Sequence, residues 1–331
     1  MIYLDNGATT RPLFESLHNS YNLWLNSHSS YSNGDYLLWE CRERIAKCIN
    51  CEPNEIYFTS GGCEGNTWCI NMLYEMLGRP VLVSPNEHKS IMNNPRIEIG
   101  NGKRFFIIGN TYDYDSCMLV NNETGVMYDC DSIHKDMVQA LGKVKVDVKK
   151  LGCKMATFSG HKVHGDKGVG FVYISEDMSK YVKPLIYGGG QERGVRGGTV
   201  DVKRVLGMVD GVELVTSDRH LAKNKALYDY FMWKLHDSEL ILNIVPAIPT
   251  FSLRNDKGIN GEYIVNRLAE KEIYISTGSA CSTGEPSYVL KNLDLTDDEA
   301  NATIRVSLDG EENSKEDIDT LFEEIGGILN E

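Results

Sequence analysis

A lysine in the run Phe158-Ser-Gly-His-Lys-Val-His-Gly-Asp-Lys-Gly-Val-Gly170 is the first candidate for chemistry. The run predicts a strand that leads into Ser159-Gly-His-Lys162, which places Lys162 at the carboxyl end of the strand. A lysine in a partly dry pocket loses proton affinity and becomes a nucleophile toward carbonyl compounds. Ser159 and His161 flank Lys162 and could hold a phosphate. For this run alone, a hairpin with surface lysines is the alternative.

Glycines precede a predicted helix in Thr59-Ser-Gly-Gly-Cys-Glu-Gly-Asn66. Such a turn exposes backbone N–H groups at the positive end of the helix, where a phosphate is stabilised. The spacing matches neither the GxxxxGK[ST] nor the GxGxxG pattern, so it does not indicate nucleotide binding of those kinds. A plain strand-to-helix turn is the alternative.

Asp136 and Gln139 lie three residues apart and would share one face of a helix. A carboxylate beside a pyridine nitrogen keeps that nitrogen protonated, as an electron-accepting pyridine cofactor requires. In isolation, an aspartate that begins a helix is the more common explanation for Asp136.

Cys281 lies among small and polar residues in Ser276-Thr-Gly-Ser-Ala-Cys-Ser-Thr-Gly-Glu-Pro-Ser287. This accessible setting favours a nucleophile, although a loop thiol without function is the alternative. The remaining cysteines are predicted to be buried thiols. Cys48 and Cys51 form the only C-x-x-C pair, so no metal site is expected.

Predicted strands and helices alternate over the first two-thirds of the chain, as in a mostly parallel sheet covered on both faces. Helices are predicted at Gly34–Ile49 and Asn66–Leu77. Strands are predicted at Glu55–Thr59, Pro80–Ser84, Phe105–Ile108, Cys117–Val120, Met155–Phe158 and Val169–Tyr173. Active sites in such sheets lie beyond the carboxyl ends of the strands.

The pattern changes after Gly188-Gly-Gly-Gln191. Val202–Leu235 predicts one long amphipathic helix that could bridge two lobes. Shorter elements follow and indicate a smaller α+β lobe: Leu240–Val245, Thr250–Leu253, Tyr263–Ala269 and Ile304–Ser307. We therefore expect a large domain at residues 10–205 and a small domain formed by residues 1–9 and 206–331.

The composition narrows the class of protein. The 331 residues include 34 Lys+Arg against 47 Asp+Glu, so the formal net charge is −13. An acidic chain without a basic block argues against nucleic-acid binding and against anionic membrane surfaces. No run approaches the roughly 18 apolar residues of a membrane span, and the first residues lack the features of a signal peptide. We expect a cytoplasmic protein.

In this chain order, the motifs resemble the cysteine desulfurases, pyridoxal-phosphate enzymes with the class-V aminotransferase fold. The resemblance covers essentially the whole chain and rests on Tyr3–Thr10, Phe58–Gly61, Glu87–Lys89, Val120–Gly125, Asp136–Gln139, Ser159–Lys162, Gly188–Thr199, Gly278–Cys281 and Ile304–Ser307. It implies fold type I of the pyridoxal-phosphate transferases. In that α/β fold, a large domain with a mostly parallel central sheet accompanies a smaller α+β domain.

The resemblance also implies roles for residues at the cofactor. Lys162 would bind pyridoxal 5'-phosphate covalently and move the Cα proton. His88 would stack on the cofactor ring and assist proton transfer. Asp136 would pair with the ring nitrogen and Gln139 with the ring hydroxyl. The implied phosphate ligands are Gly62, Cys63, Ser159, His161 and, from the partner subunit of a homodimer, Thr199.

The implied reaction removes sulfur from L-cysteine. Asn122 and Arg305 would hold the substrate carboxylate, the arginine as a bidentate fork. The thiolate of Cys281 would attack the substrate sulfur, leaving L-alanine and a persulfide on Cys281. That sulfur would pass to an acceptor protein in iron–sulfur cluster assembly, tRNA thiolation or related sulfur trafficking.

The chain departs from the family pattern in several places. Gly62-Cys63 replaces the usual Ala-Thr pair, so a phosphate-binding hydroxyl becomes a thiol, and Gly7 replaces an alanine. The chain is also unusually short: only thirteen residues separate Asn122 from Asp136, and the whole region near 90–135 looks trimmed. An obligatory partner protein or an enlarged dimer interface would then cover the large domain.

Two alternatives stay open. A selenocysteine lyase or another β-lyase on the same scaffold would keep its activity when Cys281 is replaced, because elimination of a good leaving group needs no protein nucleophile. A catalytically silent scaffold protein of the same fold would bind no cofactor and form no persulfide.

Overall fold

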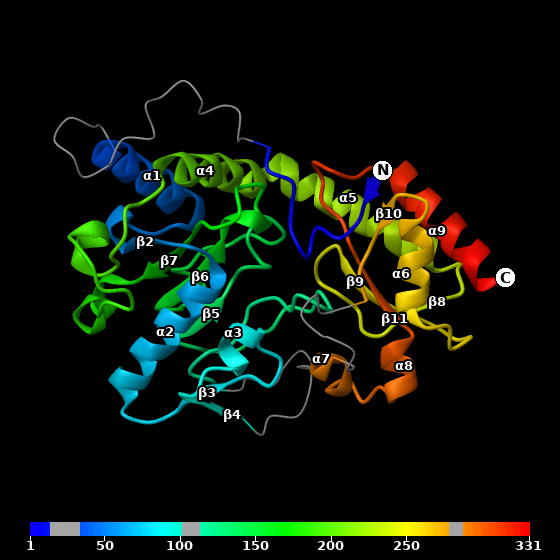
Figure 1. Ribbon diagram of the computed structural model, residues 1–331, viewed down its shortest axis with the longest axis horizontal. Helices are drawn as coiled ribbons and strands as arrows, with labels where there is room; N and C mark the ends of the chain where they lie inside the picture. Colours follow the sequence, from blue (N-terminus) through cyan, green and yellow to red (C-terminus); the bar gives the residue numbers. More distant parts are fainter. Residues whose placement is uncertain (14–33, 101–112, 278–286) are drawn as a thin grey trace.

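The computed structural model describes residues 1–13, 34–100, 113–277 and 287–331. They form a large lobe built on a central sheet and a smaller lobe that contains both ends of the chain (Figure 1). Within the described residues, none of the helices combines the length and the apolar character needed to cross a membrane.

The central sheet of the large lobe is mostly parallel. Its strands are β2 (Ile56–Thr59), β3 (Val81–Val83), β4 (Ile97–Ile99), β5 (His134–Asp136), β6 (Met155–Ser159) and β7 (Gly170–Ile174). The pairs β3–β4 and β5–β6 are parallel, whereas β7 is antiparallel to both of its neighbours, β6 and β2. Ser116 links β3 to β5 through single parallel bridges to Val83 and His134. This arrangement confirms the predicted fold class.

The predicted strand Cys117–Val120 is wrong. This segment forms only isolated contacts, such as the antiparallel bridge between Val120 and Met127. The chain reverses directly after it because Asn121 Oδ1 accepts the backbone N–H groups of Glu123 and Thr124 at 2.9 and 3.0 Å. The predicted strand Phe105–Ile108 lies outside the described residues.

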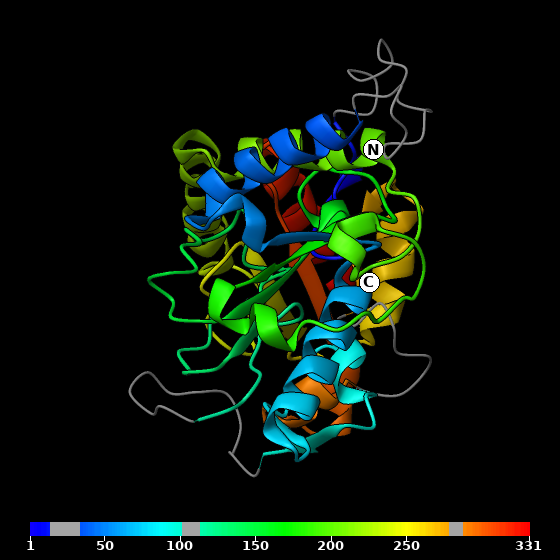
Figure 2. The same cartoon turned by 90° about the vertical axis from the view of Figure 1, so that its left-hand side faces the viewer.

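Helices cover both faces of this sheet (Figure 2). The helices and 3-10 turns of the large lobe are α1 (Gly34–Ile49), η1 (Pro53–Glu55), α2 (Gly62–Leu77), α3 (Lys89–Met92), η2 (Gly160–Lys162), η3 (Glu176–Tyr181), η4 (Gln191–Gly194) and α4 (Val202–Thr216). Alternate strand residues face opposite helices. Phe58 and Phe171 pack into the core with α1 and α4, whereas Tyr57 and Val172 pack against α2.

The single long helix predicted for Val202–Leu235 is also wrong, because the chain forms α4 and then α5 (Asp218–Leu235). Ser217 separates them with an extended backbone (φ −66°, ψ 143°). Its hydroxyl accepts the N–H of His220 at 3.2 Å and so begins α5 as an N-cap. The hydrophobic periodicity continues through this break, which is why the sequence pattern hides it.

The small lobe contains a separate hydrophobic core. Its remaining elements are β1 (Ile2–Tyr3), β8 (Leu240–Leu242), β9 (Thr250–Asn255), α6 (Gly261–Ala269), β10 (Ile273–Tyr274), α7 (Tyr288–Lys291), α8 (Asp297–Asn301), β11 (Thr303–Ser307) and α9 (Lys315–Leu329). An antiparallel sheet in the order β11-β9-β8 packs on α5, α6 and α9, and the N-terminal β1 pairs with β10. The N-terminus therefore returns to this lobe.

Two of the cysteines predicted to be free thiols are joined, since Cys117 and Cys130 form a disulfide. The reversal after Val120 lays the two arms of the chain side by side, as the hydrogen bond from Tyr128 N to Leu119 O shows, and so brings the two sulfurs together. Cys41, Cys51, Cys69 and Cys153 are buried free thiols as predicted, whereas Cys48 is half-buried.

Candidate active site

A cavity of about 280 Å³ collects most of the predicted site residues. Those that line it are Gly62, Cys63, His88, Asn122, Asp136, Gln139, Ser159, His161, Lys162 and Arg305. They come from segments more than 240 residues apart, and several follow the carboxyl ends of strands, where an active site was expected.

Lys162 ends the 3-10 turn η2 directly after β6. Its Nζ donates to the carbonyl oxygens of Gly7 and Ala8, each at 2.6 Å. Burial lowers the pKa of Lys162 to about 7, and the positive charges of Lys143 and Arg305 act in the same direction. About half of these amines are therefore neutral at pH 7, which gives Lys162 the nucleophilic form that its predicted role requires.

Asp136 is the last residue of β5, so the predicted helical relation between Asp136 and Gln139 is wrong. A turn follows the strand, because Asp136 Oδ1 accepts the N–H of Val138 at 2.9 Å. Its other oxygen, Oδ2, accepts from Asn66 Nδ2 at 2.7 Å. The turn still brings Asp136 and Gln139 to the same cavity. Pairing of β5 with β6, rather than helix periodicity, determines where this carboxylate lies.

Gln139 connects the cavity to a second lysine, Lys143, which is half-buried. Its Nε2 donates to the Gly7 carbonyl at 2.8 Å, and its Oε1 accepts from Lys143 Nζ at 2.6 Å. Burial lowers the pKa of Lys143 to about 8. Gly7 thus accepts from both Gln139 and Lys162, so the N-terminal segment holds two predicted cofactor residues at once.

His88 is the N-cap of α3. Its Nδ1 accepts the backbone N–H of Ser90 at 3.1 Å and lies 2.8 Å from Ser90 Oγ. Burial lowers the pKa of His88; the negative charge of Asp136 opposes this shift, and the positive charge of Lys162 adds to it. A neutral imidazole can stack on an aromatic cofactor ring and still exchange a proton.

The phosphate end of the predicted site is a glycine turn between β2 and α2. Gly61 has φ 147°, a conformation that side chains disfavour, and α2 begins directly after it. A Cβ on Gly62 would lie 3.0 Å from Val138 Cγ2, so glycine keeps this end of the cavity open. The positive end of a helix dipole stabilises an anion, so the start of α2 suits a phosphate.

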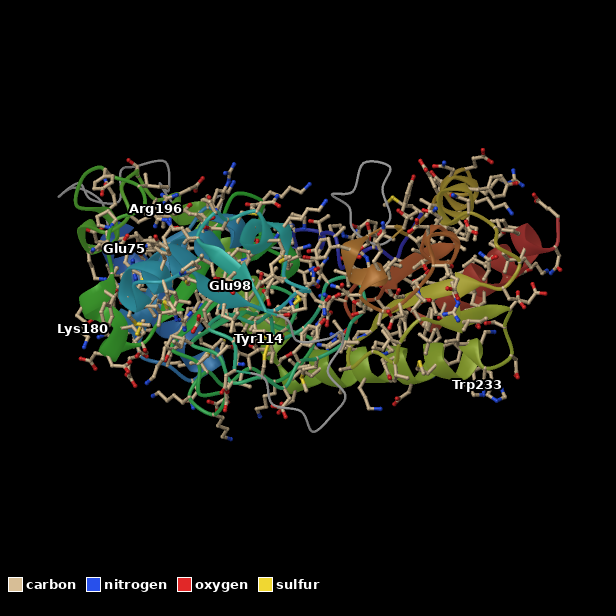
Figure 3. The ribbon with its side chains drawn as sticks, turned by 90° about the horizontal axis from the view of Figure 1, so that it is seen from below. Glu75, Glu98, Tyr114, Lys180, Arg196 and Trp233 are labelled. Atoms are coloured by element: carbon tan, nitrogen blue, oxygen red, sulfur yellow. A yellow bond between two sulfur atoms is a disulfide. The ribbon has the colours of Figure 1, made fainter. Side chains whose placement is uncertain are left out.

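A bidentate ion pair closes this turn from outside. Arg196 Nε and Nη2 donate to the two carboxylate oxygens of Glu64 at 2.9 and 3.0 Å, and Glu64 also accepts the N–H of Ser60 at 2.8 Å. Arg196, which is labelled in Figure 3, thereby ties the segment that follows η4 to the first turn of α2 through Glu64.

Ser159 and His161 lie on the other side of the glycine turn, and both line the cavity. Burial lowers the pKa of His161 to about 4, and the charges of Lys162 and Lys167 act in the same direction. His161 is therefore neutral at pH 7 and can offer one N–H donor to an anion.

Arg305 lies on β11 and is almost fully buried. Its Nη2 donates to Asp5 Oδ1 at 2.6 Å, and its Nη1 donates to the backbone carbonyl of Asn122 at 3.1 Å. Its Nε has no protein partner among the described residues. A buried, unpaired donor beside the cavity suits an anionic group of a substrate.

Sequence reasoning missed four residues of the site. Asn66 and Glu123 line the cavity, Ser90 lies behind His88, and Asp5 pairs with Arg305. Burial raises the pKa of Glu123, although a hydrogen bond from Ser287 Oγ (2.5 Å) opposes the shift. Asp5 and Glu123 lay within motifs used for the resemblance, Ser90 directly follows one, and Asn66 ends the glycine run before the predicted helix. Only tertiary contacts assign each of them a partner.

Thr199 is a predicted site residue that does not line the cavity, and it is exposed. The predicted nucleophile Cys281 lies outside the described residues. Thr199 was predicted to serve the site of a second subunit, so its position outside its own cavity does not contradict that role.

The residues in the cavity fit a phosphorylated pyridine. The start of helix α2 and the neutral imidazole of His161 lie at one end. The buried carboxylate of Asp136, which Asn66 holds by a hydrogen bond, also lines the cavity. The amine of Lys162 lies within the same space, and the unpaired Arg305 Nε offers a donor to a second anionic group.

Comparisons with known proteins agree with this chemistry. Residues 2–100 and 105–321 match the model of the family described as "Aminotransferase class-V". The chain is 31% identical to cysteine desulfurase IscS of Buchnera aphidicola (strain 5A), over 93% of this chain and 87% of that protein. The alignment spans 363 positions, more than the 331 residues of the chain, so it contains gaps in the chain.

Solved structures give the same result. A NifS-like protein superposes with a TM-score of 0.84 and 26% identity, over 99% of both chains. The NifS-like protein from Rickettsia africae superposes with a TM-score of 0.81 and 26% identity, over the whole of both chains.

Proposed function

The chain belongs to the class-V aminotransferase family and, within it, to the cysteine desulfurases, which use pyridoxal phosphate, and we propose that it takes sulfur from L-cysteine. The observation that carries the proposal is the buried Lys162 amine, whose pKa is lowered to about 7, in one cavity with Asp136 and Arg305. That combination suits attachment of a carbonyl cofactor, control of its ring nitrogen and capture of a carboxylate.

When bound, pyridoxal phosphate supplies an electron-accepting ring that stabilises negative charge at the substrate Cα. We propose that Arg305 holds the substrate carboxylate, with Asn122 beside it. Lys162 would take the Cα proton, because its amine is neutral in about half of the molecules at pH 7. His88 would then move protons to and from the departing groups.

Four phosphate ligands are proposed from the same subunit: Gly62, Cys63, Ser159 and His161. Asp136 would hold a proton on the ring nitrogen, and Gln139 would donate to the ring hydroxyl. Thr199 would complete the phosphate site of a second subunit, so we propose a homodimer.

We also propose that the cofactor domain spans residues 10–205 and that the small domain consists of residues 1–9 and 206–331.

Sulfur transfer would depend on Cys281. Its thiolate would attack the substrate sulfur and form a sulfur–sulfur bond, while the Cβ–S bond of the substrate breaks. The electron pair of that bond would go to the carbon skeleton, which takes up a proton to become L-alanine and leaves a persulfide on Cys281. We propose that an acceptor protein then takes this sulfur for iron–sulfur cluster assembly, tRNA thiolation or a related route in the cytoplasm. A partner that covers the shortened 90–135 region is part of the same proposal; the exposed Ile99 on β4 lies there.

The experiment compares the purified protein with Cys281→Ala in L-cysteine and a reductant. It records the visible absorbance of bound cofactor, alanine and sulfide. The proposal expects an absorbance band in both proteins, but alanine and sulfide only where Cys281 is present.

Other outcomes separate the alternatives. Equal sulfide release from both proteins would establish a β-lyase, and faster turnover of selenocysteine than cysteine by both would favour a selenocysteine lyase. Loss of the cofactor band in the wild-type protein would favour a silent scaffold. If the protein alone shows the cofactor band without turnover, and turnover begins once a partner protein is added, the result would support a partner-dependent enzyme.

A further inference from the structure

Two residues outside the predicted site connect the carboxylate of Asp136 to the imidazole of His88. We propose that Asn66 and Ser90 form a hydrogen-bonded relay that positions Asp136 and His88 as one unit and keeps the His88 proton on Nε2. This inference deepens the proposed function, on which its catalytic meaning rests.

The relay contains three consecutive contacts. Asn66 Nδ2 donates to Asp136 Oδ2 at 2.7 Å and to Ser90 Oγ at 2.9 Å. Ser90 Oγ lies 2.8 Å from His88 Nδ1. The four side chains come from α2, β5 and the start of α3, so the relay ties three elements together behind the cavity.

The chemistry of the groups determines the direction of each hydrogen bond. An ionised carboxylate only accepts, so the Asn66 amide must turn its N–H₂ group toward Asp136. Its second N–H then points to Ser90 Oγ, which accepts it. The Ser90 hydroxyl hydrogen is left to donate onward to His88 Nδ1.

A second donor also requires a lone pair on Nδ1 of His88. The backbone N–H of Ser90 also donates to His88 Nδ1, at 3.1 Å, and a backbone N–H cannot accept. Nδ1 must therefore present its lone pair, and a neutral His88 carries its hydrogen on Nε2. Proton exchange by His88 thus takes place at Nε2.

Burial strengthens this relay. Asn66 is 1% exposed and Asp136 5% exposed, so their hydrogen bond lies in a low-dielectric region. The charged groups that act on His88 are Asp136, Lys162 and Lys89, and their effects partly cancel. Asn66 and Ser90 are positioning residues, because they touch Asp136 and His88 rather than the reacting atoms.

The test measures the ¹⁵N signals of the His88 ring by NMR in the purified full-length protein, as isolated with its cofactor, and assigns them with His88→Gln. In the wild-type protein, the coupled hydrogen should lie on Nε2. Ser90→Ala should lower the Nε2–H to Nδ1–H ratio roughly five-fold, the effect of one hydrogen bond of about 1 kcal/mol, and Ser90→Thr should restore it.

Coupling distinguishes a relay from local packing. Asn66→Ala should lower the same ratio although no hydrogen bond joins Asn66 to His88 among the described residues. The double variant with Asn66→Ala and Ser90→Ala should show the same Nε2–H to Nδ1–H ratio as Ser90→Ala alone, because both changes interrupt the same chain of hydrogen bonds. If the fold-changes in this ratio for Asn66→Ala and Ser90→Ala multiply in the double variant, the two residues act independently and the proposal is overturned. An unchanged ratio in Ser90→Ala would also overturn it. Ser90 is only half-buried, so Ser90→Ala provides the answer if Asn66→Ala does not fold.

Ser116→Ala is the matched control. Ser116 Oγ makes the same kind of contact to His134 Nδ1, at 2.8 Å, away from the cavity. This variant should change the His134 signals and leave those of His88 unchanged. The NMR result does not depend on turnover, so a protein with an intact relay but no release of alanine would refute the proposed function alone.

Discussion

Replacing Lys143 with methionine should raise the pKa of the Lys162 amine. Lys143 Nζ donates to Gln139 Oε1, Gln139 Nε2 donates to the Gly7 carbonyl, and Lys162 Nζ donates to that same carbonyl, at 2.6, 2.8 and 2.6 Å. Two ammonium groups thus share one hydrogen-bonded chain, and the charge of Lys143 disfavours the charge of Lys162. Methionine keeps the apolar stem of lysine and removes the charge.

The expected rise in the pKa of Lys162 follows from the lowering of that pKa in the wild-type protein. The pKa of Lys162 falls from 10.5 to about 7, mostly through burial, with the charge of Lys143 as the next largest cause. The pKa of Lys143 is about 8, so it is mostly charged at pH 7. At an effective dielectric constant of ~20, a charge beyond direct contact contributes on the order of 1–2 kcal/mol, or about one pKa unit. The neutral fraction of Lys162 at pH 7 should therefore fall from about half to about a tenth.

The assay follows the rate at which the cofactor-free protein regains its visible absorbance when pyridoxal phosphate is added, at pH values from 6 to 10. The rate should rise with pH as Lys162 loses its proton, with a midpoint near 7 for the wild-type protein and near 8 for Lys143→Met. Lys149→Met is the control, because Lys149 is exposed and pairs only with Glu52 among the described residues. A wild-type midpoint near 10, or a Lys143→Met midpoint at or below that of the wild type, would refute the reasoning.

Three further variants test separate parts of the site and its supports. Cys63→Thr should tighten pyridoxal phosphate binding roughly five-fold, since a hydroxyl donates more strongly than a thiol; equilibrium dialysis that shows weaker binding would contradict this. Arg305→Lys should raise KM for L-cysteine at least ten-fold through loss of the fork geometry, and an unchanged KM would remove Arg305 from the carboxylate site. Glu192→Ala should lower the free energy of unfolding by about 3 kcal/mol, because it leaves the buried Arg42 without its partner at 2.6 Å; urea unfolding that shows a loss below about 1 kcal/mol would argue against this pair.

Local patterns were enough to predict the reactive groups and most of the elements. The strand before Lys162 and the glycine turn after β2 depend on neighbours a few residues away, so the sequence alone placed Lys162 at a strand end. The helix predicted from Asn66 begins at Gly62, because the glycine turn itself forms its first turn. Helix α1 was predicted with its observed bounds. These features depend on backbone preference and hydrophobic period, which short segments already contain.

Contacts between distant segments were decided only in three dimensions. The spacing of Asp136 and Gln139 would place them on one face if the segment were helical, but Asp136 lies on β5, which pairs with β6. Asn66 reaches Asp136 across 70 residues of chain, and Asp5 reaches Arg305 across 300. No local period contains such pairs, because they exist only once two cores have packed and buried their polar groups together. The sequence therefore determined which groups could react, and the tertiary structure decided which residues hold them in place.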